Sequence, residues 1–561
     1  MLFFGALVIV ILVVTEFFYR PPKPAQPQPS DQTPAAGSAA KPATPATKPA
    51  DLPAEARRAA EEVETVIEND LYRITFTNRG ARVKSWILKK FTDDHGKPLD
   101  LVNPLAAPTV GYPMSLWTYD EGLRNKLNDA LYVADIQGGS ANGNVRSAPA
   151  TLTFEYSDQQ STVRKRLKFD HSYVVEVEVS ASNGGSTLQA FPAWPGGFGD
   201  QTVAGSYLQA HVVYQTSDKI ERLDPKHVSG GNTLHGPLYW AGATDQYFAA
   251  LFLPENPDTA ALVTLQQNIT VPRNRNKPDP KEVDHVPVQG AAVGDASGTT
   301  RERLFVGPKT LEVLSSVRAA NGSDLSGAVD FGFFGIFARW LFLSLNWIHD
   351  HLHVDWGWAI VILTVLINAA LLPMRISSMK MSLKMQRIQP QMDDIKKKYE
   401  KYSLRDPRRQ EMQKEIWDLQ KREGVNMLGG CLPMLLQLPF LWAFYAMLSN
   451  AIELRHAHWL WIRDLSAPDP YHLLPLATIV TMMGLQQMTP QAGMDPAQRR
   501  MMNVMMPIMF GWFTWTVASG LALYWTIGNV VFVLQQAVMN RTALGREIRE
   551  MQAKRARKKG K

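Results

Sequence analysis

Long apolar stretches dominate the chain after residue 331, and they constrain the fold more than any other feature of the sequence. A membrane-crossing helix needs about 20 predominantly apolar residues, and runs close to this length recur here. A purely soluble globule is therefore excluded, although 45% hydrophobic and 20% charged residues look like an average soluble protein. We expect five membrane spans, at residues 356–372, 433–448, 473–488, 501–518 and 521–538.

Ser519 and Gly520 are the predicted turn between the last two spans. Without a turn, residues 501–538 would make one helix of about 57 Å at 1.5 Å per residue. That length is nearly twice the thickness of the hydrocarbon core of a bilayer, so we expect two spans rather than one.

The first apolar run, residues 2–19, is either a cleaved signal peptide or an uncleaved anchor. No Lys or Arg precedes it, and no small-x-small cleavage site follows directly, so we expect an N-terminal anchor span over residues 1–19. Residues 20–59 are rich in Pro, Ala, Thr and Lys. This composition cannot pack a core and is typical of an extended linker.

Residues 60–328 have the pattern of a β domain. Apolar and polar side chains alternate with a period of two over residues 71–77, 163–169 and 173–179, and turn clusters separate such runs. Many short strands with turn signals favour an antiparallel sandwich. The chain holds one cysteine, Cys431, so this domain must be stable without an intramolecular disulfide.

Residues 329–350 connect the β-patterned segment to the first of the five spans. The segment is aromatic but contains Arg339 and Asn346, which favours an amphipathic helix lying in the membrane interface. The alternative is a further membrane span.

Charge on the connections predicts their side of the membrane, because Lys and Arg near spans stay on the cytoplasmic side. Residues 374–428 hold 14 Lys and Arg against 8 Asp and Glu, and residues 540–561 hold nine against two. We therefore expect an inner-membrane protein of a bacterium, with both termini in the cytoplasm and residues 60–328 in the periplasm. Since the basic residues flank the spans, the net charge of +7 does not indicate DNA binding.

The first basic connection contains a predicted helical hairpin, residues 377–425. Pro390 should bend its first helix, and the second should begin with Asp406 as N-cap and Pro407 at the first helical position. The hairpin and the basic tail, residues 541–561, could contact a ribosome or a targeting factor. A solvated face that only sets orientation agrees equally well with the charge.

Motifs for catalysis or nucleotide binding are absent from the sequence, which has no GxxxxGK[ST], HExxH, GxSxG or Rossmann glycine pattern. His349, His351 and His353 could bind a metal. However, a spacing of two points helical side chains to different faces, and no fourth ligand is evident. We therefore expect no enzyme activity, no cofactor and no metal.

The five spans carry amides and hydroxyls but no Asp, Glu, Lys or Arg. Thr364 and Asn368 stand four residues apart, so on a helix they form a polar stripe on one face of the first span. Polar groups at membrane depth face protein or water, because lipid cannot satisfy them. The stripe agrees with a hydrated groove, and hydrogen bonding between packed helices is the other explanation.

Several ordered blocks of sequence resemble the YidC/Oxa/Alb membrane-protein insertase family. In the second half they are residues 426–433 (NMLGGCLP), 437–439 (QLP), 460–471 (LWIRDLSAPDPY) and 519–524 (SGLALY). In the first half, residues 78–86 (NRGARVKSW) and 245–250 (DQYFAA) resemble the periplasmic domain of the Gram-negative YidC type.

This resemblance implies a multi-domain membrane protein with an α-helical insertase core, residues 354–540, of five spans plus the N-terminal anchor span, and a periplasmic antiparallel β-supersandwich. The implied function is that of an insertase and chaperone, which inserts nascent inner-membrane proteins into the lipid bilayer and helps them fold, through a hydrated groove open to cytoplasm and lipid, alone or with the Sec translocon. The implied groove and client-contacting residues are Thr364, Asn368, Leu438, Pro439, Leu441, Phe510, Phe513, Tyr524 and Trp525.

Asn368 departs from the family, which usually carries an arginine at this position of the groove. The flanking match from Asp355 through Thr364 supports this register. Arg375 lies two turns nearer the cytoplasm and cannot simply substitute. The resemblance therefore does not carry the family's groove cation over to this chain.

Two other functions remain open from the sequence. β-Sandwiches often bind carbohydrate, so the alternative is a membrane-anchored periplasmic protein that binds or converts a sugar. This alternative predicts a convergent carboxylate pair within residues 60–325. An ion channel is the third possibility.

Overall fold

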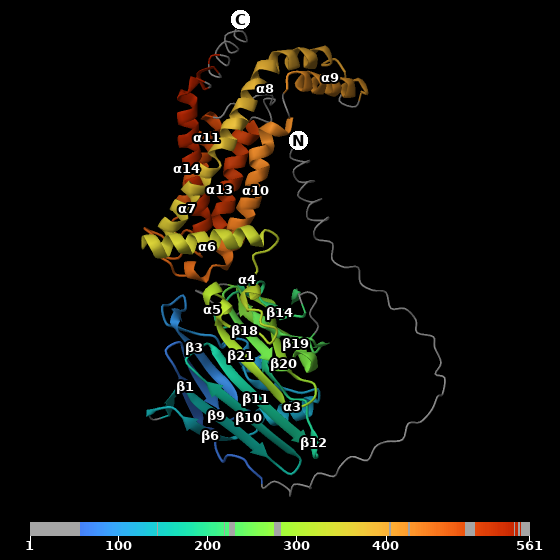
Figure 1. The fold of residues 1–561 in the computed structure, drawn as a ribbon, viewed down its shortest axis with the longest axis vertical. Coiled ribbons are helices and arrows are strands. Elements are labelled where there is room, and N and C mark those ends of the chain that lie inside the picture. The colour runs from blue at the N-terminus through green and yellow to red at the C-terminus, as the bar shows by residue number, and fades with distance from the viewer. Residues whose placement is uncertain are drawn as a thin grey trace, which may run out of the picture.

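The computed structural model describes residues 56–142, 144–217, 219–223, 230–273, 282–402, 406–424, 427–488, 500–543, 545–547 and 550. The predicted anchor, residues 1–19, lies outside these residues, as do most of the predicted linker and the end of the basic tail. Figure 1 shows a β-rich N-terminal half and a helical C-terminal half stacked end to end.

Strands in three sheets build the N-terminal half. The ten-stranded sheet has the order β15-β14-β17-β18-β21-β11-β10-β9-β6, with β12 paired to β11; the other two have the orders β4-β3-β2-β1-β8-β7 and β16-β19-β20-β13-β5. The strands of the ten-stranded sheet are β6 (Val133–Gly138), β9 (Ala150–Ser157), β10 (Ser161–Phe169), β11 (Val174–Asn183), β12 (Ser186–Thr187), β14 (His211–Gln215), β15 (Ile220–Leu223), β17 (Trp240–Thr244), β18 (Phe248–Pro254) and β21 (Thr300–Pro308). The other strands are β1 (Glu64–Glu68), β2 (Tyr72–Thr77), β3 (Arg82–Thr92), β4 (Pro98–Asp100), β5 (Ser115–Trp117), β7 (Ala141–Asn142), β8 (Val145–Ser147), β13 (Phe191–Trp194), β16 (Thr233–His235), β19 (Ala260–Pro272) and β20 (Val283–Asp295).

Short helical segments lie between the strands. They are α2 (Ala107–Val110), α3 (Glu121–Asp129), η2 (Pro257–Thr259), α4 (Ala204–Tyr207), α5 (Leu311–Ser316) and η3 (Ser326–Ala328).

The period-two pattern of the sequence predicted the strands correctly where it was clearest. The runs at 71–77, 163–169 and 173–179 form β2, β10 and the start of β11. Strand β10 alternates strictly between buried and exposed side chains along its whole length, because one face covers the core and the other faces solvent. The pairing is antiparallel except between β1 and β8, which run parallel.

The ten-stranded sheet is covered on its core face by the two shorter sheets. Phe76 of β2 packs against Phe154 of β9 and Phe169 of β10, with ring centroids 6.1 and 5.8 Å apart. Strand β20 of the five-stranded sheet packs against β14, β17, β18 and β21. A β-rich domain with a continuous apolar core is therefore confirmed.

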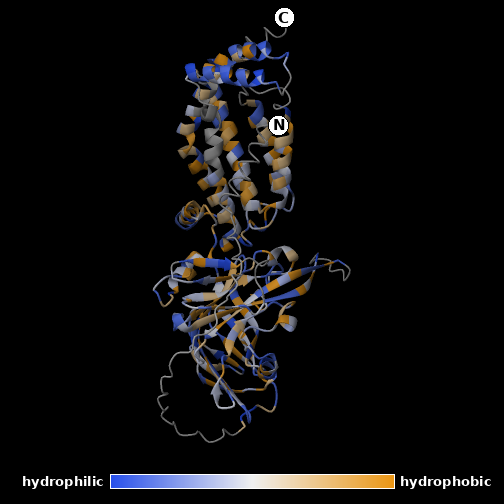
Figure 2. Ribbon diagram, turned by 90° about the vertical axis from the view of Figure 1, so that its right-hand side faces the viewer, coloured by the Kyte–Doolittle hydropathy of each residue, from blue (hydrophilic) through white to orange (hydrophobic). Residues whose placement is uncertain are grey.

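Helices build the C-terminal half, and Figure 2 shows hydrophobic residues along the bundle and hydrophilic residues on the hairpin at its far end. The elements are α6 (Gly335–Leu352), α7 (Trp356–Ala370), α8 (Leu372–Lys398), α9 (Arg408–Arg422), α10 (Met427–Asn450), η4 (Ile452–Leu454), α11 (Leu473–Met488), a π-helical turn η5 (Met501–Met505), α13 (Met506–Thr516) and α14 (Ser519–Arg541). Helix α14 packs against α7 and α11, α11 packs against α13, and α10 packs against α6 and α8.

Helix α6 crosses one end of the bundle, between the helices and the β domain (Figure 1). It is bent by 119° from α7. One face, which includes Leu341 and Leu345, is buried against the bundle, whereas Ile336 and Trp340 on the other face are at least 70% exposed. Helix α6 is therefore apolar on both faces, and the interfacial position expected for residues 329–350 stays a prediction.

Each of the five predicted spans contains a helix. By length and hydropathy, α14 with 23 residues is the one described helix that could cross a membrane alone, α6 and α7 pass the same test as a bent pair, and α11 is shorter. Helix α7 continues almost directly into α8, because only Leu371 separates them.

The predicted turn at Ser519–Gly520 is wrong by two residues. The chain breaks at Val517 and Ala518, which have extended backbones, and Ser519 and Gly520 are the first residues of α14. Their N–H groups donate to the carbonyls of Ala467 and Leu465 at 2.7 and 2.8 Å. Carbonyls of the connection before α11 therefore accept hydrogen bonds from the N–H groups in the first turn of α14. The sequence around residue 519 could not indicate these distant acceptors.

The hairpin consists of α8 and α9, packed through a small core of Ile388, Met392, Met412 and Ile416. Pro390 lies inside α8, as predicted. Helix α9 begins one residue later than predicted, since Pro407 rather than Asp406 is its N-cap. The Asp406 carboxylate still accepts a hydrogen bond from the Arg408 N–H at 3.0 Å.

The glycine at position 357, in the first turn of α7, is required because another part of the chain packs very closely against it. The indole ring of Trp459, from the connection between α10 and α11, lies where a side chain at this position would begin. Trp459 is 5% exposed, and its N–H and carbonyl pair with those of Ile462 at 2.8 Å. A residue without a side chain is therefore required at position 357 for this connection to pack on α7.

Candidate functional site

Thr364 and Asn368 lie on the buried face of α7, as the polar stripe predicted. The Thr364 hydroxyl donates to the carbonyl of Ile360, and the Asn368 amide donates to the carbonyl of Thr364, each at 2.7 Å. Thr364 is fully buried and Asn368 is 5% exposed. The two side chains thus sit within the bundle and use their donors on their own helix, as buried polar groups do in apolar surroundings.

Gln535 of α14 extends the stripe toward the hairpin. Its amide N–H donates to the carbonyl of Asn368 at 3.2 Å, and its amide oxygen accepts from the guanidinium of Arg375 at 3.0 Å. The Arg375 guanidinium also lies over the ring of Phe532, 3.0 Å from its centroid. The Arg375 guanidinium is therefore linked to the backbone of Asn368 through the side chain of Gln535.

The link between Arg375 and α14 was not predicted from the sequence. The sequence predicts Arg375 two turns nearer the cytoplasm than Asn368 but does not indicate which helix faces it. The only available signal is the spacing of Phe532 and Gln535, which lie about one helical turn apart and so share a face of α14.

Polar side chains also join α11 to α14. The hydroxyls of Thr478 and Thr526 are 2.8 Å apart, and both residues are buried. Asn529, one turn farther along α14, is 6% exposed, and its amide nitrogen has no hydrogen-bond partner among the described residues. An unsatisfied donor at this depth is a place where water or a polar chain segment could bind.

The aromatic residues predicted to contact clients fall into two groups. Trp525 of α14 packs edge to face against Phe510 and Phe513 of α13, with ring centroids 4.8 and 5.9 Å apart. Tyr524, the neighbouring residue, instead stacks on Phe444 of α10 at 4.0 Å. The structure therefore brings Phe510, Phe513 and Trp525 together and places Tyr524 in the core of the bundle.

The predicted contact residues on α10 are only partly described. Pro439 and Leu441 are half-buried in this helix, and Leu441 packs on the edge of the bundle core. Leu438 belongs to α10, but its side chain lies outside the described residues.

The histidines considered as metal ligands are engaged elsewhere. A ring nitrogen of His349 lies 2.7 Å from the carbonyl of Val354, and one of His351 lies 3.1 Å from the carbonyl of Trp347. Across the part of the chain that the structure describes, no group of three or more His, Cys, Asp or Glu side chains could hold a metal ion.

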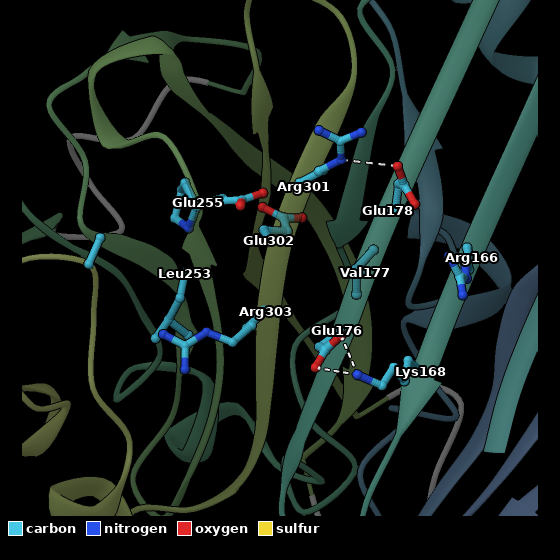
Figure 3. Close-up of a pocket in the computed structure, with 12 residues that line it drawn as sticks. Arg166, Lys168, Glu176, Val177, Glu178, Leu253, Glu255, Arg301, Glu302 and Arg303 are labelled. Atoms are coloured by element: carbon cyan, nitrogen blue, oxygen red, sulfur yellow. Dashed lines mark hydrogen bonds and ion pairs between the residues drawn. The ribbon is translucent and has the colours of Figure 1, made fainter. Parts of the chain in front are cut away.

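A pocket of about 580 Å³ lies on the outer face of the ten-stranded sheet, far along the chain from the stripe. Figure 3 shows Lys168 paired with Glu176, and Arg301 paired with Glu178, across neighbouring strands. Two of its carboxylates are thus neutralised by adjacent cations. Glu255 and Glu302 also line the pocket and lie beside each other in Figure 3, with no ion pair drawn for either.

Family comparisons divide the chain as the structure does. Residues 64–344 match a family described as the YidC periplasmic domain, and residues 347–546 match one described as the 60Kd inner membrane protein.

Relatives match nearly the whole chain. A protein of Geobacter metallireducens named membrane protein insertase YidC is 31% identical, covering 97% of this chain and 99% of the relative. A protein of Syntrophus aciditrophicus with the same name is 30% identical over 93% of this chain and 92% of its own length.

Solved structures are less similar. A crystal structure described as an active YidC insertase with the first transmembrane domain resolved is 16% identical, covers 97% of this chain and all of that chain, and has a TM-score of 0.36. A galactose mutarotase-like protein from Lactobacillus casei is 12% identical, with a TM-score of 0.25, and covers 44% of this chain and all of that chain.

Proposed function

The chain belongs to the YidC family of membrane protein insertases, and from this premise we propose how it inserts newly made membrane proteins into the bacterial inner membrane. The observation that carries the function is the similarity to insertases over 97% of the chain. A client helix would pass along the polar stripe of Thr364 and Asn368 and leave toward lipid along α10 and α13. The aromatic cluster of Phe510, Phe513 and Trp525 would contact its apolar side chains.

Insertion along this path needs no nucleotide. Each central Leu, Ile, Phe or Val of a client gains roughly 0.3–0.6 kcal/mol on entering lipid, so about 20 such residues gain about 6–12 kcal/mol. The barrier is the polar segment beside the client helix, which must cross hydrocarbon. A donor partway across the bilayer, such as the side-chain amide of Asn529, would lower that barrier by replacing water.

We place the β domain in the periplasm and the hairpin in the cytoplasm. The family is found in the inner membrane with a periplasmic domain. The excess of Lys and Arg in residues 374–428 supports a cytoplasmic hairpin, and hence five spans after the anchor with both termini inside. The long sheet covered by two shorter ones supports a β-supersandwich.

Nascent membrane proteins are the substrates that the family implies. We propose the Sec translocon as a further partner, and a ribosome or targeting factor as the partner of the basic hairpin and tail. The excess of basic residues in both segments, 14 against 8 acidic residues in 374–428 and nine against two in 540–561, supports an anionic surface such as ribosomal RNA or an acidic protein face.

Reconstitution tests the path directly. Full-length protein in liposomes should protect the translocated tail of a single-span client from protease, and empty liposomes should not. Asn368→Leu should reduce protection for clients with polar tails, because it removes an amide from the stripe and dries its surroundings. The matched control is Val365→Leu, a change on the exposed side of the same helix, 42% exposed, which should leave protection unchanged.

Equal protection by Asn368→Leu and the unchanged protein would contradict the proposed path, although not the insertase function itself. The alternative of a sugar-binding or sugar-converting protein is not favoured, because the relatives named as insertases match over 99% and 92% of their own length.

A further inference from the structure

The turn between β17 and β18, residues 245–248, faces the helical half of the molecule. These residues open one of the sequence blocks that resemble the periplasmic domain, and the proposed insertion path does not use them. The first residue of β18 pairs with Pro308, three residues before α5 begins, and Figure 1 shows α5 on the side of the β domain that meets the bundle.

Buried polar groups lock the conformation of this turn. One carboxylate oxygen of Asp245 accepts hydrogen bonds from the N–H groups of Tyr247 and Phe248 at 2.7 and 2.6 Å. The buried ammonium of Lys309 donates to the Asp245 carbonyl. The carboxyl of Asp200 also lies beside Asp245, and burial together with this neighbouring carboxylate raises the pKa of Asp200.

Gln246 projects from the locked turn to the end of α10. Its side-chain N–H donates to the carbonyl of Ser449 at 2.7 Å. Ser449 is the penultimate residue of α10, so its carbonyl is one of the last four that have no partner within the helix. The β domain therefore supplies a C-terminal cap for a helix of the bundle.

A second contact lies just beyond the end of α10. The guanidinium of Arg455 donates to the carbonyl of Thr92 at 3.0 Å and lies 5.8 Å from the ring centroids of Tyr247 and Phe248. The side chain of Arg455 is only 9% exposed. Between the two contacts, Ile452 is 3% exposed and belongs to the apolar core of the β domain rather than to that of the bundle.

We propose that Gln246 and Arg455 are positioning residues for insertion, which hold the periplasmic end of α10 at a fixed angle to the β domain. This inference rests on the proposed function, since α10 borders the path along which clients leave. A 24-residue helix is about 36 Å long, so a tilt of about 5° at one end moves the other by about 3 Å. Pro439 and Leu441 lie about 17 and 14 Å from the held end, so the same tilt moves them by about 1.4 and 1.2 Å, enough to alter their contact with a client side chain.

Spin labels on the full-length chain test the positioning. After Cys431→Ser, one label is placed at exposed Arg166 on β10 and the other at Tyr445, which is 43% exposed on α10. The distance distribution between the labels should be narrow. It should broaden in Gln246→Glu, which keeps the size of the side chain but cannot donate to the Ser449 carbonyl. Gln246→Lys, which can donate, should restore the narrow distribution.

Gln189→Glu is the matched control, because the Gln189 amide donates to a backbone carbonyl, that of Ala296, at 2.6 Å entirely within the β domain. This change should leave the distance distribution unchanged. Insertion of a single-span client should slow about threefold to tenfold in Gln246→Glu, the range expected for one lost hydrogen bond, and recover in Gln246→Lys. Arg455→Gln, which removes the second contact, should reproduce both effects.

An unchanged distance distribution in Gln246→Glu and in the double variant with Arg455→Gln would overturn the proposal. A broader distribution with unchanged insertion would also overturn it, because α10 would then move without consequence. If the unchanged protein fails to insert any client, the proposed function is wrong, whereas the distance measurement still reports on the contact between β domain and α10.

Discussion

Glu302 is a buried acid without a partner, and changing it to Gln should make the β domain more stable near neutral pH. Glu302 lies on β21, opposite Val177 of β11 and Pro254 of β18, on the face of the sheet that covers the core. It is 5% exposed, and neither carboxyl oxygen has a hydrogen-bond partner among the described residues. Burial therefore raises the pKa of Glu302 well above its usual 4.5.

The pH dependence follows from where the proton is held. Above about pH 4.5 the unfolded chain loses the Glu302 proton, whereas the folded domain keeps it. The unfolded state thus binds fewer protons, so stability falls as the pH rises toward the folded pKa, by about 1.36 kcal/mol per pH unit. Gln carries no proton to lose. Between pH 5.5 and pH 7.5, the stability of Glu302→Gln should therefore rise relative to that of the unchanged protein, with this slope as the upper limit.

Pulse proteolysis in urea measures this difference on the full-length protein in detergent, by following the intact β domain at each pH. The control is Glu176→Gln on β11, an exposed acid paired with Lys168 at 3.0 Å, which should change stability by less than about 1 kcal/mol at either pH. If Glu302→Gln and the unchanged protein keep a constant difference from pH 5.5 to 7.5, the carboxyl is not held neutral and the reasoning is refuted.

Three further predictions concern other parts of the molecule. The buried ammonium of Lys165 donates to the carbonyls of Ala81 and Met114 at 2.7 and 2.6 Å. Because Lys165→Met leaves both carbonyls without this donor, it should lower the free energy of unfolding by about 3 kcal/mol. An unchanged urea midpoint would show that the carbonyls find other donors. Asn368→Arg should be tolerated, since the family usually carries arginine there, and loss of complementation in a depletion strain at normal protein level would disprove this. Removing residues 554–561 should weaken co-sedimentation with translating ribosomes at low salt more than at high salt, because exposed charges are screened; equal co-sedimentation of both proteins at low salt would exclude a role for the tail.

The sequence predicted the elements well where one periodicity applied throughout. Strand β10 keeps its period of two even at Lys165, a charged residue at an inward position. Propensity alone would place that lysine in solvent, but the turn after β2 and the residue before β5 supply carbonyls that bind its ammonium. Long-range acceptors of this kind have no signature near the lysine itself.

Helix positions in the second half were also predictable, but their partners were not. Thr364 and Asn368 were expected on one face of α7, and they lie there. The link from Asn368 through Gln535 to Arg375 depends on how α14 packs against α7 and α8, which no local pattern encodes. The contact of Gln246 with the end of α10 joins residues more than 200 positions apart, and sequence periodicity cannot report such a pairing.

The close approach of Trp459 to Gly357 sets a rule for how the family can vary in evolution. A larger residue at position 357 cannot be absorbed by a shift of α7 alone, because the indole is held by the paired backbone of Ile462 in the same connection that carries Arg455. We therefore expect the two positions to covary among relatives, with a side chain appearing at 357 only where the aromatic ring at 459 has become small.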